Sequence, residues 1–218
     1  MIALQEISLG HRAWPYATAG VDPVRKIPPA TWEILERALV PPPFAFGLLP
    51  WLFLIVRDPQ VRALLGSPSA AQAPLFGCSH FVVFARNITM SAADVETFIH
   101  RATDGHTAQH GAFRVYSVSR SREGSNGARG ISVEEWTARQ AYVALGDLMA
   151  SATLLGVDAC PIDGFDPAQY DEVLGLAAKG YATVCACALG YRATDRLDAA
   201  ADTTVFHLGG DNWLPRNP

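Results

Sequence analysis

The chain of 218 residues is 50% hydrophobic, which is enough for one domain with a complete core. Its formal net charge of −4 at pH 7 gives no basic field for nucleic acid or for an anionic membrane surface, so neither partner is expected. The N-terminus lacks the regions of a signal peptide, and the longest apolar run, residues 43–56, is interrupted by Gly47 and Pro50 and is too short to span a bilayer, so we expect a cytoplasmic protein.

The first half of the chain is predicted to alternate helices and strands. Residues 28–39 are expected to form a helix, because prolines stand at its start and Trp32, Leu35 and Leu39 follow at helical spacing. The next expected elements are a strand over residues 52–57, a short helix over 58–65, a buried strand over 80–86 and a helix over 92–101. Residues 117–130 are rich in Ser, Gly and Arg without an apolar period, which predicts a mobile surface loop.

The longest helix is predicted over residues 131–155, opened by a capping box of Ser132 and Glu135. One apolar face of this helix is expected to contain Ala141, Ala144, Leu145, Leu148, Ala152 and Leu155. A turn over residues 160–165 leads to a second helix that includes residues 173–176 and is closed by Lys179 and Gly180. Residues 182–189 form a strand without alternation, which predicts that both of its faces are covered.

Two carboxylates lie near the predicted start of the second helix. Asp163, which precedes Gly164 and Phe165, is expected either to cap this helix or, less readily, to carry a proton in catalysis. Asp166, followed by Pro167, fits a helix start equally well, since proline suits the first helical position. The residues themselves leave both positions open as the cap.

The four cysteines form no Cys-x-x-Cys pair, and Cys185 and Cys187 are expected on one face of a strand. Buried, reduced thiols are therefore predicted. No group of histidines, cysteines and carboxylates has metal-ligand spacing, so no metal site is expected.

Residues 136–192 resemble the C-terminal half of the FMN-dependent nitroreductase family in the order of helix, Cys-Pro-Ile-Asp-Gly-Phe turn, helix and buried strand. Residues 16–27, 43–56 and 78–84 resemble the first loop and helix and the first two strands of the same family. The resemblance implies an α+β fold of three layers (α/β/α), with a central mixed or antiparallel sheet flanked by helices. It also implies a single domain over 1–218, a homodimer with cofactor sites at its interface, a variable insert over 95–130 and a tail over 198–218 that wraps the partner.

The positions that contact FMN in this family carry unusual residues here. The corresponding residues are Pro15, Ala17 and Ala19 in the first loop, Phe44, Ala45 and Leu49 before the first strand, Ala71 or Pro74 before the second strand, and Thr203 and Val205 near the C-terminus. In the family, basic residues at several of these positions hold the flavin phosphate, and a buried phosphate needs such partners. The turn formed by Pro161, Asp163 and Gly164 persists, and in the family the equivalent pair offers backbone N–H groups to the flavin ring. We therefore predict that the anchors are lost and that no cofactor occupies the standard site.

Three functions follow from these observations. The first is a flavin-independent enzyme or binder that uses an apolar pocket at the dimer interface for a small hydrophobic or aromatic molecule. In that case Asp163, Tyr16 and His207 are the candidate proton carriers. The second is an FMN-dependent NAD(P)H oxidoreductase that reduces nitroaromatics or quinones. The third is a non-catalytic dimeric pseudoenzyme.

Overall fold

A four-stranded sheet forms the middle layer of the structure, a computed structural model that describes residues 21–39, 51–66, 76–89 and 133–193. The strands are β1 (Trp51–Ile55), β2 (His80–Asn87), β3 (Asp158–Ile162) and β4 (Tyr181–Gly190), in the spatial order β1-β2-β4-β3. Each neighbouring pair runs antiparallel. The expected central sheet is therefore confirmed, and its described strands are purely antiparallel, without a parallel pair.

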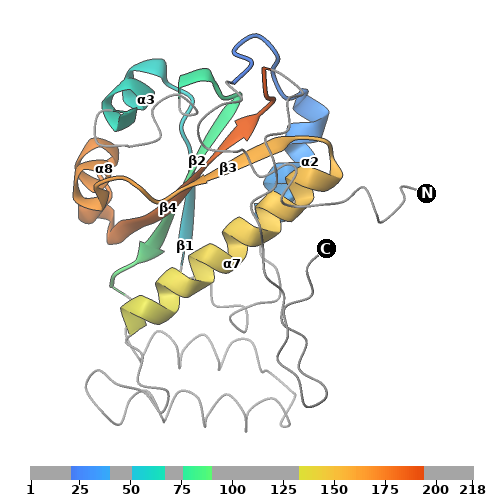
Figure 1. The fold of residues 1–218 in the computed structure, drawn as a ribbon. Coiled ribbons are helices and arrows are strands. Elements are labelled where there is room, and N and C mark those ends of the chain that lie inside the picture. Colours follow the sequence, from blue (N-terminus) through green and yellow to red (C-terminus); the bar gives the residue numbers. More distant parts are fainter. Residues whose placement is uncertain (1–20, 40–50, 67–75, 90–132, 194–218) are drawn as a thin grey trace, which may run out of the picture.

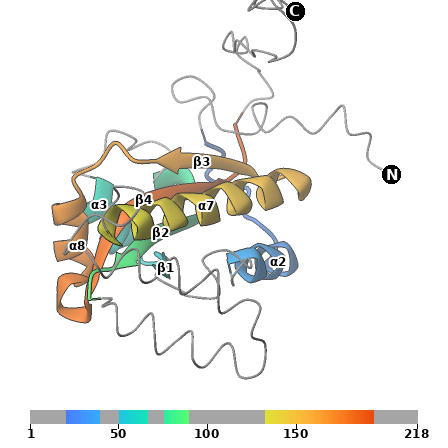
Figure 2. The same cartoon turned by 90° about the horizontal axis from the view of Figure 1, so that it is seen from below.

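Helices cover both faces of this sheet (Figure 1). Helices α2 (Pro29–Leu39) and α7 (Val133–Leu154) pack with one face into a core that includes Phe84 and Leu148. Helices α3 (Pro59–Gly66) and α8 (Pro167–Leu174) cover the opposite face in a second core that includes Phe81 and Tyr170. Figure 2 shows α7 running lengthwise along the sheet. The three-layer α+β architecture is thus confirmed.

Strand β4 contributes side chains to both cores. Cys185, Cys187 and Leu189 face the core under α7, whereas Ala186 and Ala188 face the core under α8. All five side chains are fully buried. A strand between two helical layers needs apolar residues on both sides, so the sequence shows a continuous apolar run, as predicted.

The apolar face of α7 is confirmed for five of its six expected members, since Ala141, Ala144, Leu145, Leu148 and Ala152 are all buried. Leu155 is the exception, with 36% of its surface exposed. It follows the last helical residue, Leu154, so the helical period that placed it on the buried face no longer applies there. Apart from α8, the other helices and strands that were expected within the described residues begin and end within two residues of their predicted limits.

Strand β3 was missed, because residues 160–165 were expected to form a turn alone. The strand is short and contains Pro161, which lowers its strand propensity. Proline is tolerated there because β3 lies at the edge of the described sheet and pairs on one side only, with β4.

The limits of α8 correct two predictions. The carboxylate of Asp166 accepts hydrogen bonds from the backbone N–H groups of Ala168 (2.9 Å) and Gln169 (3.4 Å), so Asp166 is the cap and Asp163 is not. The helix ends at Gly175, whose φ of 62° is left-handed, rather than at Lys179 and Gly180, which close a separate 3₁₀ turn.

His80 joins α2 to the start of β2. Its ring stacks on the Trp32 indole, with centroids 3.8 Å apart and planes 8° from parallel. Its Nδ1 lies 3.0 Å from the Ser79 hydroxyl, which itself accepts a hydrogen bond of 2.9 Å from the backbone N–H of Ile27. Burial, and then the positive charges of neighbouring arginine and lysine side chains, lower the pKa of His80 to about 4.

This environment makes stability depend on pH. Because the folded-state pKa of His80 lies below its ordinary value of 6.5, folding favours the neutral ring. The contribution is therefore complete above pH 6.5 and is lost as the pH falls from 6.5 toward 4. We expect the midpoint of urea denaturation to fall more between pH 7 and pH 5 in the wild type than in His80→Gln. Equal falls in both proteins would contradict this assignment.

Several predictions concern residues outside the described ranges. They are the helix over 92–101, the loop over 117–130, the insert over 95–130, the tail over 198–218 and the capping residue Ser132. Within the described part of the chain, no helix is long and apolar enough to cross a membrane.

Candidate functional site

The predicted site divides between described and undescribed residues. Pro161, Asp163 and Gly164 are described and lie together where β3 turns toward α8. The other predicted site residues lie outside the described ranges: Pro15, Tyr16, Ala17, Ala19, Phe44, Ala45, Leu49, Pro74, Thr203, Val205 and His207.

The turn after β3 is held firmly by its neighbours. Ile162, the last residue of the strand, is buried, whereas Asp163 and Gly164 are exposed. The backbone N–H of Phe165 donates to the carbonyl of Asp163 at 3.0 Å. The ring of Phe165 then stacks on Tyr170 of α8, with centroids 4.1 Å apart. The turn thus presents its backbone and the Asp163 carboxylate at the surface of a packed scaffold.

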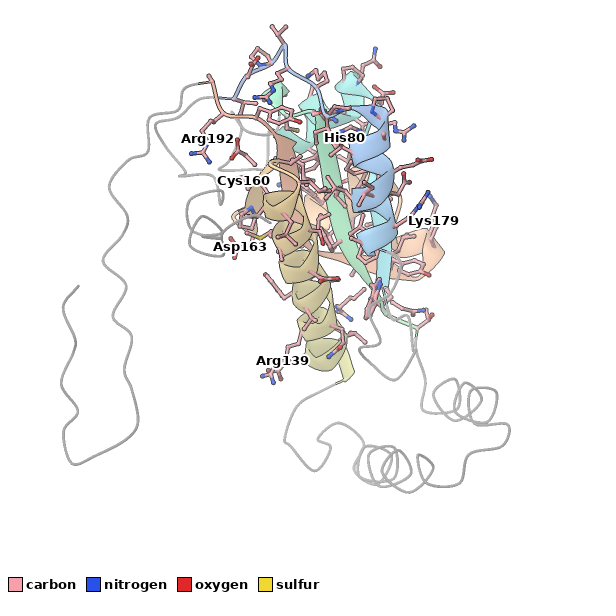
Figure 3. All side chains as sticks on the ribbon, turned by 90° about the vertical axis from the view of Figure 1, so that its right-hand side faces the viewer. His80, Arg139, Cys160, Asp163, Lys179 and Arg192 are labelled. Atoms are coloured by element: carbon pink, nitrogen blue, oxygen red, sulfur yellow. The ribbon has the colours of Figure 1, made fainter. Side chains whose placement is uncertain are left out.

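Helix α7 runs past this turn and carries Tyr142. In Figure 3, Asp163 lies beside the middle of α7, whereas Arg139 lies near the N-terminal end of the helix. Burial, followed by the charges of Cys185 and Asp163, raises the pKa of Tyr142 above its ordinary value. Tyr142 was not singled out from the sequence, although it directly follows the buried face of α7 at Ala141.

The outward face of α7 combines two partly exposed side chains with a glycine. Tyr142 and Val143 expose 45% and 41% of their surfaces, and Gly146 is also exposed. A side chain placed on Gly146 would meet no atom of the described chain within 4 Å. Glycine in a helix interior costs about 0.5–1 kcal/mol relative to alanine. The described chain therefore leaves this stretch of α7 open on its outward face.

The buried thiols offer no nucleophile. Cys78, Cys160, Cys185 and Cys187 are all buried and form no disulfide, as predicted. Burial raises the pKa of Cys185 to about 12 and that of Cys160 to about 12, so both stay protonated near neutral pH. The described residues contain no group of three or more histidines, cysteines and carboxylates able to hold a metal ion.

The described turn fits the polar edge of a flavin ring, whereas the positions predicted for the phosphate lie outside the described residues. The exposed backbone at Asp163 and Gly164 suits the polar edge of a flavin ring. The positions assigned to the phosphate carry Pro15, Ala19, Thr203 and Val205, none of which bears a charge.

Two arginines near the ends of the scaffold are already paired with carboxylates. Arg139 binds Glu135, one turn away on α7. Arg192, just after β4, binds Asp158 at 2.6 Å. Both arginines are therefore engaged by carboxylates within the described part of the chain.

The chain belongs to the nitroreductase family, a family of oxidoreductases whose model matches residues 22–191. A protein of Staphylococcus epidermidis, provisionally named NAD(P)H nitroreductase, is 32% identical over 190 residues, which are 83% of this chain and 85% of the relative. The crystal structure of a provisionally assigned nitroreductase from Exiguobacterium sibiricum in complex with FMN has a TM-score of 0.68 at 17% identity, covering 93% of this chain and 94% of that one. A provisionally assigned NAD(P)H:FMN oxidoreductase structure from S. epidermidis has a TM-score of 0.67 at 20% identity, covering 93% of both chains.

Proposed function

We propose that this protein uses the nitroreductase scaffold without FMN at the standard site. It binds a small, largely apolar or aromatic molecule beside the turn formed by residues 161–165, at the interface of a homodimer. The proposal rests on one observation. The turn that contacts the flavin ring in the family persists here, whereas the four positions predicted to hold the phosphate carry uncharged residues.

The loss of one basic residue would leave the phosphate with other partners. Here all four positions that correspond to the family's basic residues are uncharged: Pro15, Ala19, Thr203 and Val205. No charge is therefore left among them to bind the phosphate. Burying a phosphate without such partners costs several kcal/mol. An apolar or aromatic ring has no such requirement, because its affinity comes from the surface it buries.

The outward face of α7 supports a homodimer. Gly146→Leu is expected to convert the dimer to a monomer of 23.4 kDa, because the leucine would stand where the partner approaches the helix. Size-exclusion chromatography with light scattering measures this change. Glu33→Leu is the matched control, since it adds the same side chain at a position that is 71% exposed on α2. An unchanged dimer for Gly146→Leu would show that α7 does not form the interface.

A second candidate function is FMN-dependent reduction by NAD(P)H. It is favoured by the preserved turn at Asp163 and Gly164 and by the provisional name of the S. epidermidis relative. Bound flavin would supply hydride transfer, and the turn would hold the polar edge of its ring.

An absorption spectrum of the freshly purified protein, followed by titration with FMN, separates the two functions. The proposed function predicts a colourless protein that takes up little FMN and binds a neutral aromatic probe such as 4-nitrotoluene. Flavin at about one per protomer would establish the second candidate instead. A protein that binds neither FMN nor the probe would fit a dimeric pseudoenzyme.

A further inference from the structure

Three basic side chains gather around the start of β2, at the end of the sheet where β1 leads into α3 (Figure 1). One of them, Arg62 on α3, is half-buried and lies against three backbone carbonyls. Its Nε donates to the carbonyl of Val56 at 2.8 Å, its Nη1 to that of Cys78 at 3.1 Å and its Nη2 to that of Ser79 at 3.3 Å. The guanidinium thus ties the end of β1 to the residues that open β2.

The other two cations, Lys26 and Arg57, are exposed and are placed by their neighbours in the chain. Lys26 precedes Ile27, whose backbone N–H donates to the hydroxyl of Ser79 at 2.9 Å. Arg57 follows Val56, whose carbonyl accepts the hydrogen bond from α3. Three segments that are far apart in the sequence therefore each bring one cation to the start of β2.

No carboxylate pairs with these cations within the described part of the chain. The carboxylates that lie near them in the sequence cap backbone groups instead. Asp22 Oδ1 accepts the N–H groups of Val24 at 2.9 Å and Arg25 at 3.0 Å. Asp58 Oδ1 accepts the N–H of Gln60 at 2.7 Å. Both carboxylates are thus turned toward their own loops, and the three cations stay without an ion-pair partner among the described residues.

The neighbouring titratable groups indicate a positive field at this place. Burial, and then the charges of Arg62, Arg57 and Lys26, lower the pKa of His80 to about 4. Burial raises the pKa of Cys78 to about 11, and the charges of Arg62 and Lys26 oppose that rise. The side-chain charges that act on these two groups are all positive, although the whole chain has a formal net charge of −4.

We propose that Lys26, Arg57 and Arg62 form a binding site for a small ligand that carries a phosphate or diphosphate group. Three cations close together match a group that concentrates several negative charges in a small volume, and arginine and lysine both bind phosphate oxygens. Arg62 is already held by its carbonyl contacts, so it loses little conformational freedom when an anion binds. The second N–H of its Nη2 has no acceptor among the described residues and is available to an oxygen of the ligand.

This site is separate from the turn after β3. The start of β2, at His80, pairs with Leu189 of β4, whereas the end of β3, at Ile162, pairs with Ala186. The three cations also differ from the four residues predicted at the phosphate positions of FMN. The inference therefore goes beyond the proposed function and does not depend on it.

Isothermal titration calorimetry with inorganic pyrophosphate at low ionic strength tests the proposal. The variant Lys26→Gln with Arg57→Gln is expected to weaken binding about tenfold, because it removes two exposed charges and leaves the carbonyl contacts of Arg62 in place. The matched control is Arg37→Gln with Arg139→Gln, which removes the same total charge from exposed arginines on α2 and α7. The control should change the affinity by less than about twofold, since screening weakens charges at a distance.

Equal weakening in the two double variants would show that net charge, and not this cluster, attracts the anion, and would overturn the proposal. A wild-type protein that binds no pyrophosphate would overturn it as well. A polyglutamate peptide is the comparison ligand, and tighter binding of that peptide than of pyrophosphate would assign the surface to an acidic protein partner instead. The titrations with FMN and 4-nitrotoluene test different residues, so the proposed function and this proposal can fail independently.

Discussion

Replacing Asp158 with asparagine is expected to lower the free energy of unfolding by about 3–5 kcal/mol, because it leaves the Arg192 guanidinium buried without its counter-charge. Asp158 Oδ1 lies 2.6 Å from Arg192 Nη2 and 3.2 Å from its Nε, and Oδ2 accepts the backbone N–H of Arg192 at 3.0 Å. The two side chains are only 5% and 11% exposed. Denaturation with urea at pH 7 measures the loss.

The matched control is the exposed ion pair between Arg139 and Glu135 on α7. Glu135→Gln should cost only about 0.3–0.5 kcal/mol, because solvent screens the pair. A double-mutant cycle with Asp158→Asn and Arg192→Met should show that the two losses are less than additive. Additive losses, or a loss as small as that of the control, would show that the buried pair does not hold the end of β4 to the start of β3.

Restoring basic residues at the four phosphate positions is expected to raise the affinity for FMN by about 100-fold or more. The variant is Pro15→Arg, Ala19→Lys, Thr203→Lys and Val205→Arg. Each charge-assisted hydrogen bond to phosphate contributes about 1.5–3 kcal/mol, and each 1.4 kcal/mol is tenfold in affinity. Flavin fluorescence quenching measures the gain.

Riboflavin is the control ligand for this experiment, because it has the same ring without the phosphate. Its affinity should stay unchanged in the fourfold variant. An equal gain for both ligands would indicate a general effect on the pocket rather than a phosphate site. No gain for FMN would mean that Phe44 fills the flavin position or that the four positions do not correspond to the family's anchors.

These two experiments test separate properties of the protein, the stability of the scaffold and the affinity for the cofactor. The packed scaffold, with its ion pair at one end and its turn at the other, is expected to persist whether or not a flavin binds. What changes in the fourfold variant is the chemistry of residues that contact the ligand. A protein that becomes yellow after these four substitutions would therefore show that cofactor use in this scaffold depends on a small set of charges.

The sequence alone predicted the elements whose character is local. Helix α7 was evident because its buried residues recur with the helical period over six turns' worth of sequence, roughly 22 residues. Strand β4 was evident because a strand buried on both faces has no polar positions. The order of these elements and the preserved turn were sufficient to indicate the family, which the match over residues 22–191 then showed.

The features that the sequence did not predict depend on contacts between distant parts of the chain. Strand β3 contains Pro161 and is a strand only because β4 pairs with it. Asp158 and Arg192 are 34 residues apart, and nothing in their local sequence distinguishes them from exposed charges. The choice of Asp166 over Asp163 as the helix cap depended on which carboxylate the turn brings to the first free N–H groups.

By itself, the sequence was sufficient for the fold class, because the order and periodicity of the elements are properties of the chain. The lack of charge at the phosphate positions stays a prediction. Only the tertiary structure decided that Arg192 is paired with Asp158. The physical reason is that burial and electrostatic interaction depend on distance in space, which the packing of α7 and β3 against β4 sets.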